Sequence, residues 1–99
     1  MAKAFSAPFY FFAGPSKLMR VTIPDGHRLV VFSMGNSPSV VPPEVMPMGD
    51  YEMAPEPLPG GSYPIGMQVL PAGQASLVEK ISASTSDDIM REAAMEMPA

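Results

Sequence analysis

The sequence has no cysteine, a single histidine and no long apolar run. Without cysteine, neither a disulfide framework nor a cysteine-based zinc cluster can stabilise the fold. No apolar stretch approaches the ~20 residues that a membrane-spanning helix needs, so we expect no membrane partner. We therefore expect residues 1–99 to fold as one domain around a small hydrophobic core, with help from association with other chains.

Catalytic machinery is also sparse. His27 is the only histidine, and it follows Asp25 in a segment that we expect to form an exposed turn. The sequence contains no G-x-S-x-G nucleophile motif, no G-x-x-x-x-G-K-[ST] loop and no G-x-G-x-x-G loop. The adjacent acids Asp87 and Asp88 point in different directions on a helix, and the other acids do not match a calcium loop. We predict no catalytic, cofactor-binding or metal-binding residues, and no enzyme activity.

Charged residues make up only 16% of the chain, against about 25% in typical globular domains. A small domain has a large surface per residue, so a low charge indicates that part of this surface is not in contact with water. Ten methionines are present, and methionine suits both irregular cores and adaptable contact surfaces. This composition predicts contact with other protein chains.

The few charges are distributed unevenly. Residues 1–35 hold four cations and one acid, a balance of +3, whereas residues 36–99 hold two cations and nine acids, a balance of −7. Opposite charges on the two parts can attract each other within one chain or between neighbours. No basic cluster is available to displace counterions from a phosphate backbone, so we expect no nucleic-acid partner.

The region 5–35 shows strand patterns. The aromatic run 8–12 favours a strand, and residues 17–23 alternate between apolar and polar side chains, as a half-buried strand does. Pro24, Asp25 and Gly26 have the chemistry of a turn, with glycine accepting a positive φ. Because residues 28–34 are again apolar, the pattern predicts a β-hairpin over 17–34.

Proline dominates the region 36–64, which holds eight of the thirteen prolines. Proline breaks helices and cannot donate to a sheet ladder, so we expect an extended arm with almost no regular structure. Valine, methionine and tyrosine are interleaved with the prolines, which is not typical of a disordered linker. The arm therefore lies against a surface, either that of another chain or that of its own domain.

The region 65–83 is expected to contain short strands. Residues 65–70 fit a strand and residues 71–73 a turn. We interpret residues 74–82 as a second strand, although Leu77, Val78 and Ile81 also fit the apolar stripe of a helix.

A helix is predicted over residues 84–97. Ser84 with Asp87, or Thr85 with Asp88, has the spacing of a capping box, and Asp87 and Arg91 are placed for an i, i+4 ion pair. The apolar face of the helix comprises Ile89, Met90, Ala93, Ala94 and Met97. Because so short a helix is not stable alone in water, it must dock on its own sheet or on a neighbouring chain.

These patterns predict a mainly β fold: a small antiparallel β domain with a long proline-rich arm and one short C-terminal helix. The expected function is that of a structural protein packing against copies of itself or a larger shell, such as a capsid-decorating or head–tail accessory component of a phage virion. A small cytoplasmic protein-binding module or adaptor is the alternative. The predicted contact residues are Phe9, Phe11, Val40, Val41, Met46, Met48, Tyr51, Tyr63, Met90 and Met97.

Overall fold

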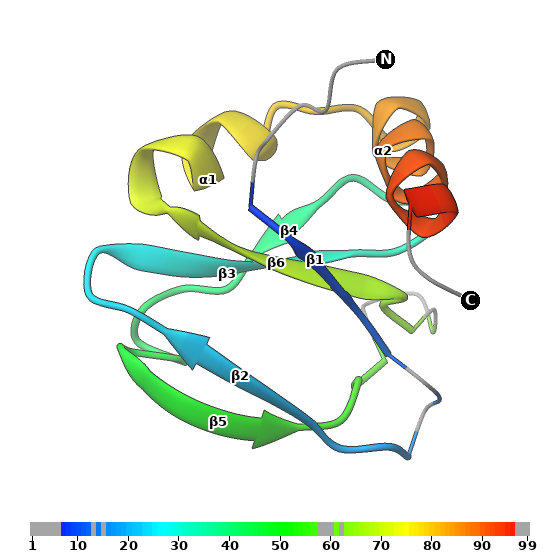
Figure 1. The fold of residues 1–99 in the computed structure, drawn as a ribbon. Coiled ribbons are helices and arrows are strands. Elements are labelled where there is room, and N and C mark those ends of the chain that lie inside the picture. Colours follow the sequence, from blue (N-terminus) through cyan, green and yellow to red (C-terminus); the bar gives the residue numbers. More distant parts are fainter. Residues whose placement is uncertain (1–6, 13, 15, 58–60, 62, 97–99) are drawn as a thin grey trace.

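The computed structural model describes residues 7–12, 14, 16–57, 61 and 63–96. These residues form six strands and two helices: β1 (Phe9–Phe11), β2 (Met19–Ile23), β3 (His27–Phe32), β4 (Ser39–Val40), β5 (Gly49–Met53), β6 (Gly66–Pro71), α1 (Ala72–Val78) and α2 (Ala83–Glu96). A four-stranded sheet has the order β1-β6-β3-β4, and β2 pairs with β5 in a separate two-stranded ribbon. Both helices cover one face of the four-stranded sheet, and the ribbon lies on its other face (Figure 1).

The central strands β3 and β6 are buried on both faces because they lie between the helices and the ribbon. Val30 and Phe32 of β3 pack in a cluster with residues of both helices, whereas Leu29 packs with Val21 and Ile23 of the ribbon. Successive residues of a strand point to opposite faces, so the apolar run of β3 supplies both clusters. All strand pairs are antiparallel, and the fold is therefore mixed, rich in strands but not purely β.

The predicted hairpin over 17–34 is wrong in its pairing, although its strands and its turn are confirmed. His27 N donates to Pro24 O at 3.1 Å, and Gly26 has a φ of 76°. The strands on either side of this turn enter different sheets, with β2 paired to β5 and β3 paired to β6 and β4. Because both edges of β3 already have partners, β2 lies across the face of the sheet.

The region 36–64 is not an arm without regular structure. It contains β4 and β5, and β5 pairs along its whole length with β2, from Met19 opposite Met53 to Ile23 opposite Gly49. Pro38 and Pro55 are buried, so the segment wraps its own domain. The prolines in this region that flank β5, at positions 47 and 55, lie outside its ends and leave its ladder intact.

The structure has two C-terminal helices where the sequence pattern predicted one. Residues 72–78 form α1 instead of a turn and strand, with Ala75 and Val78 buried at helical spacing. The predicted helix over 84–97 is confirmed as α2, although residue 97 lies outside the described part. Met90 is 3% exposed in the cluster that contains Phe32, so α2 docks on its own sheet.

The start of α2 differs from the predicted capping box. Ser82 is the capping residue, because its hydroxyl accepts a hydrogen bond from Thr85 N at 3.4 Å and its carbonyl accepts one from Ser86 N at 2.9 Å. Arg91 pairs with Asp88 at 3.2 Å, three residues away, and not with Asp87. The carboxylate of Asp87 instead accepts a hydrogen bond from Gly35 N at 2.9 Å, which joins α2 to the turn after β3.

This contact gives a first prediction. We expect Asp87→Ala to lower the free energy of unfolding by about 1 kcal/mol, because the Gly35 amide loses its acceptor. Asp88→Ala is the matched control, and its exposed ion pair with Arg91 is worth less than about 0.5 kcal/mol. Urea denaturation of both variants measures the difference. Equal effects of the two substitutions would show that the Gly35 contact contributes no stability.

Candidate contact surface at the apolar end

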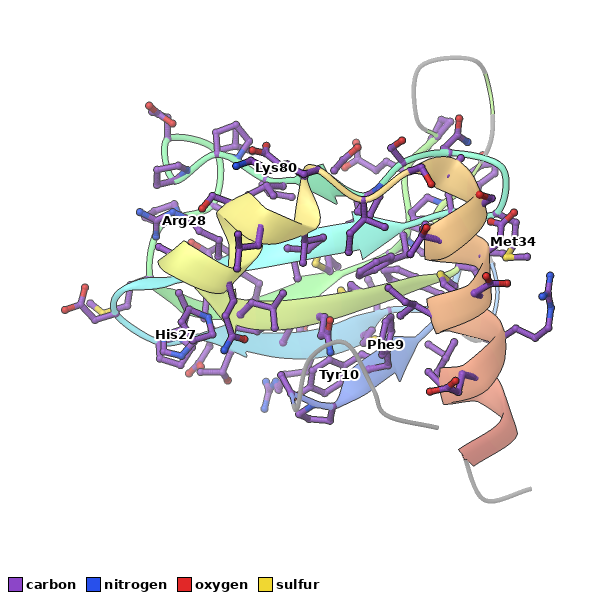
Figure 2. All side chains as sticks on the ribbon, turned by 90° about the horizontal axis from the view of Figure 1, so that it is seen from above. Phe9, Tyr10, His27, Arg28, Met34 and Lys80 are labelled. Atoms are coloured by element: carbon purple, nitrogen blue, oxygen red, sulfur yellow. The ribbon has the colours of Figure 1, made fainter. Side chains whose placement is uncertain are left out.

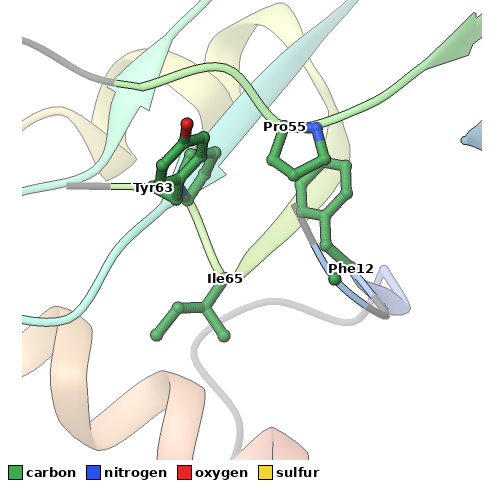
Figure 3. Close-up of a pocket in the computed structure, with 6 residues that line it drawn as sticks. Phe12, Pro55, Tyr63 and Ile65 are labelled. Carbon is green, nitrogen blue, oxygen red and sulfur yellow. The ribbon is translucent and has the colours of Figure 1, made fainter. Parts of the chain in front are cut away.

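A hollow of about 190 Å³ lies where three segments meet: the end of β1, the segment after β5 and the segment before β6. The residues that line it are Phe12, Gly14, Pro55, Tyr63, Pro64 and Ile65. Figure 3 shows the rings of Phe12 and Pro55 next to each other, with Tyr63 on the opposite side. The hollow is thus built from parts of the chain that are far apart in sequence.

Backbone hydrogen bonds hold the wall of this hollow in place. Phe12 N donates to Ile65 O at 3.0 Å, and Ile65 N donates to Phe32 O at 2.8 Å. The backbone of Ile65 is therefore bonded on both sides, while its side chain remains 40% exposed. Tyr63 is 47% exposed. These apolar groups are presented to solvent from a fixed frame.

Leu18 lies at the same end of the molecule and is 70% exposed. It precedes Met19, which pairs with Met53, and therefore lies near Pro55 in the register of the ribbon. We refer to Phe12, Leu18, Pro55, Tyr63 and Ile65 together as the apolar end. Two opposite charges flank it, since Lys17 and Glu56 are both exposed.

The described residues of the apolar end supply mainly apolar side chains. Among the described residues that line the hollow, only Tyr63 has a titratable side chain. The volume of the hollow, about 190 Å³, is below the roughly 300–1,000 Å³ of typical small-molecule sites. A hollow of this size and composition can take up an apolar side chain of another protein, with the Tyr63 hydroxyl free to form a hydrogen bond at the rim.

The only histidine lies far from this surface. His27 begins β3 and pairs with Pro71, whereas Phe32, which ends β3, pairs with Gly66 beside the hollow. The two positions are five residue steps apart along the strand, a distance on the order of 17 Å. His27 is half-buried, with Nδ1 3.1 Å from Asp25 O. Among the described residues, no three acidic, cysteine or histidine side chains are grouped as a metal site would require.

The ten predicted contact residues have different positions in the structure. Six are half-buried and pack against the core clusters of their own domain: Phe9, Phe11, Val40, Val41, Met46 and Tyr51. Met90 is buried, and Met97 lies outside the described residues. Met48 and Tyr63 are exposed, at 63% and 47%. Apolar surface available to a partner is therefore found at these two residues and at positions that were not predicted.

Leu18 and Ile65 are the exposed residues of the apolar end that sequence reasoning missed. Leu18 precedes a strand in which Met19, Val21 and Ile23 point inward, so the period-two pattern places it on the outer, polar face with Arg20. An apolar residue on the polar face of a strand pattern is a signal of exposure, and this signal could have identified Leu18. Ile65 has no such signal, because it directly precedes β6 and its sequence neighbours Pro64 and Gly66 are both buried.

Comparison with protein-family models gives no match, and neither the curated proteins nor the solved structures include a match to this chain. Within the described residues, neither helix is long and apolar enough to cross a membrane. The proposed function therefore rests on the geometry of the apolar end.

Proposed function

We propose that this protein is a structural assembly component that uses its apolar end to pack against copies of itself. The observation that carries the proposal is the preformed hollow at the same end of the molecule as Leu18, which is 70% exposed. Solvent contact with large apolar side chains is unfavourable, and burying one fully contributes about 1.5–3 kcal/mol. Leu18, Tyr63 and Ile65 together supply the central apolar cluster that stable interfaces require.

Rigidity strengthens this proposal. The backbone of Ile65 is hydrogen-bonded to both β1 and β3 segments, so little conformational entropy is lost when a partner covers it. The adaptor alternative needs an accessible extended arm, but this region pairs as β4 and β5 with its own domain. Its exposed prolines, Pro42, Pro43, Pro47 and Pro57, lie in the short segments beside these strands. The observations therefore favour assembly through folded surfaces over recognition of a proline-rich arm.

The setting that we propose is a phage virion, in which the chain decorates a capsid or acts as a head–tail accessory protein. Such a role requires repeated contacts between small copies and no catalytic group, which agrees with the low charge of 16%. Genes for capsid or tail proteins beside the gene for this chain would support the setting. Neighbouring genes that encode only metabolic enzymes would count against it without affecting the assembly proposal.

Charge substitutions at the apolar end test the assembly function. We expect Leu18→Glu and Tyr63→Glu each to convert the assembled protein to a monomer, because a carboxylate would be buried without a partner. Leu77→Glu is the matched control: Leu77 is 56% exposed on α1, which follows the opposite end of β6 from the hollow. Light scattering after size-exclusion chromatography measures the mass, and circular dichroism verifies the fold.

Assembly of all three variants to the same mass would rule out the apolar end as the contact surface. Loss of assembly in Leu77→Glu alone would transfer the contact to α1.

A further inference from the structure

A second exposed apolar site lies on the loop between β4 and β5. Val45 is 69% exposed and Met48 is 63% exposed. The loop is held in shape, because Val45 N and Met46 N both donate to Pro42 O, at 3.0 and 3.1 Å. Met46 packs against the core between them. We refer to Val45 and Met48 as the apolar knob.

The loop is also anchored from the strand that follows it. The hydroxyl of Tyr51 donates a hydrogen bond to Pro47 O, between the two residues of the knob. Tyr51 itself is half-buried against the ribbon cluster. The exposed side chains of the knob are thus presented from a constrained loop, as those of the apolar end are presented from a fixed frame.

The knob and the apolar end lie at opposite ends of β5. Gly49, next to Met48, pairs with Ile23, whereas Met53, two residues before Pro55, pairs with Met19. Figure 1 shows β5 running beside β2 along the lower part of the molecule. At about 3.3 Å per residue, the knob and the hollow are on the order of 20 Å apart, so they cannot meet within one chain.

We propose that the partner of the apolar end is the apolar knob of a second copy, so that copies associate head to tail. This inference rests on the proposed function. The hollow of about 190 Å³ is lined by aromatic and proline rings. The flexible, polarizable side chain of methionine packs well against such rings. Because this contact joins two different patches, a pair of copies still has one free knob and one free hollow. Further copies can therefore bind until a ring closes or a filament grows.

One charge beside each patch can form an ion pair across the head-to-tail contact. Glu44 is exposed next to Val45, and Lys17 is exposed next to Leu18. In the described part of the chain, neither side chain has an ion-pair partner. Head-to-tail contact brings Glu44 of one copy to Lys17 of the next. Pairing of two apolar ends would instead bring Lys17 of one copy to Glu56 of the other and leave the knob unused, so substitutions in the knob distinguish the two arrangements.

Mixing two defective variants tests this arrangement. Met48→Glu removes the knob and Tyr63→Glu blocks the hollow, so each variant alone is expected to have the mass of a monomer. A 1:1 mixture is expected to form a heterodimer of twice that mass and nothing larger, because only one intact knob and one intact hollow can meet. Val45→Glu provides a second knob variant, and circular dichroism establishes that each variant is folded.

Three outcomes would overturn the proposal in distinguishable ways. Normal assembly of both knob variants together with a monomeric Tyr63→Glu would show that apolar ends pair with each other, which leaves the proposed function intact. A mixture that stays monomeric would exclude the knob as the partner of the hollow. A wild-type protein that is monomeric at every concentration would overturn both this inference and the proposed function.

Discussion

Replacing Phe32 with alanine is expected to lower the free energy of unfolding by about 3–5 kcal/mol. Phe32 is fully buried at the end of β3, and its ring lies 5.0 Å from that of Phe9. It also belongs to the cluster that includes Met90 of α2. The substitution therefore removes a contact shared by β1, β3 and α2, and the rigid sheet cannot close the cavity.

This loss is a large fraction of the 5–15 kcal/mol that stabilises a typical domain. The measurement is denaturant unfolding in the monomeric Tyr63→Glu background, where association contributes no stability. Leu77→Ala removes an exposed apolar side chain of similar kind and is expected to change stability by less than about 0.5 kcal/mol. A loss below about 1 kcal/mol for Phe32→Ala would contradict the packing of α2 and β1 on this residue.

Adding one methyl group at Gly66 is expected to cost about 1–3 kcal/mol. A Cβ atom at this position would lie 3.2 Å from Tyr10 O, 3.4 Å from Met90 Cε and 3.5 Å from Phe11 Cδ1. The Met90 side chain can move, but the Tyr10 carbonyl belongs to the paired backbone of β1. Gly66→Ala must therefore displace β1 from the sheet or strain the strand itself.

Gly73→Ala is the matched control, with the opposite expected sign. Gly73 lies in α1, and a Cβ atom there would meet nothing within 4 Å. Alanine favours a helix over glycine, so the free energy of unfolding is expected to rise by up to about 1 kcal/mol. Thermal unfolding of both variants measures the two signs. A stabilising Gly66→Ala would mean that β1 does not approach β6 as closely as the structure indicates.

Local sequence patterns located most of the elements but not their partners. The turn at Pro24 and the strands around it are predicted by residue types that act over a few positions. Pairing of β2 with β5 depends on contacts about thirty residues away, for example Thr22 with Asp50 at 2.7 Å. The inward residues Tyr51 and Met53 alternate with acids in a proline-free window, a strand signal that was hidden by the surrounding prolines.

The candidate surface was only partly predictable for a related reason. Apolar composition indicates that contact surfaces exist, but it does not show which apolar residues the domain buries. Met46 and Met48 are two residues apart in one loop, yet Met46 packs on the core and Met48 is 63% exposed. Figure 2 similarly shows Phe9 lying within the fold on β1, whereas Met34 lies at its margin.

Sedimentation velocity of the wild-type chain tests the central claim, self-association through folded apolar surfaces, most directly. The sedimentation coefficient is expected to rise with protein concentration, from that of the 10.5 kDa chain toward that of larger species. Moderate salt should leave most of this association intact, because apolar contacts are not screened. A coefficient that stays at the monomer value over the whole concentration range would contradict the claim.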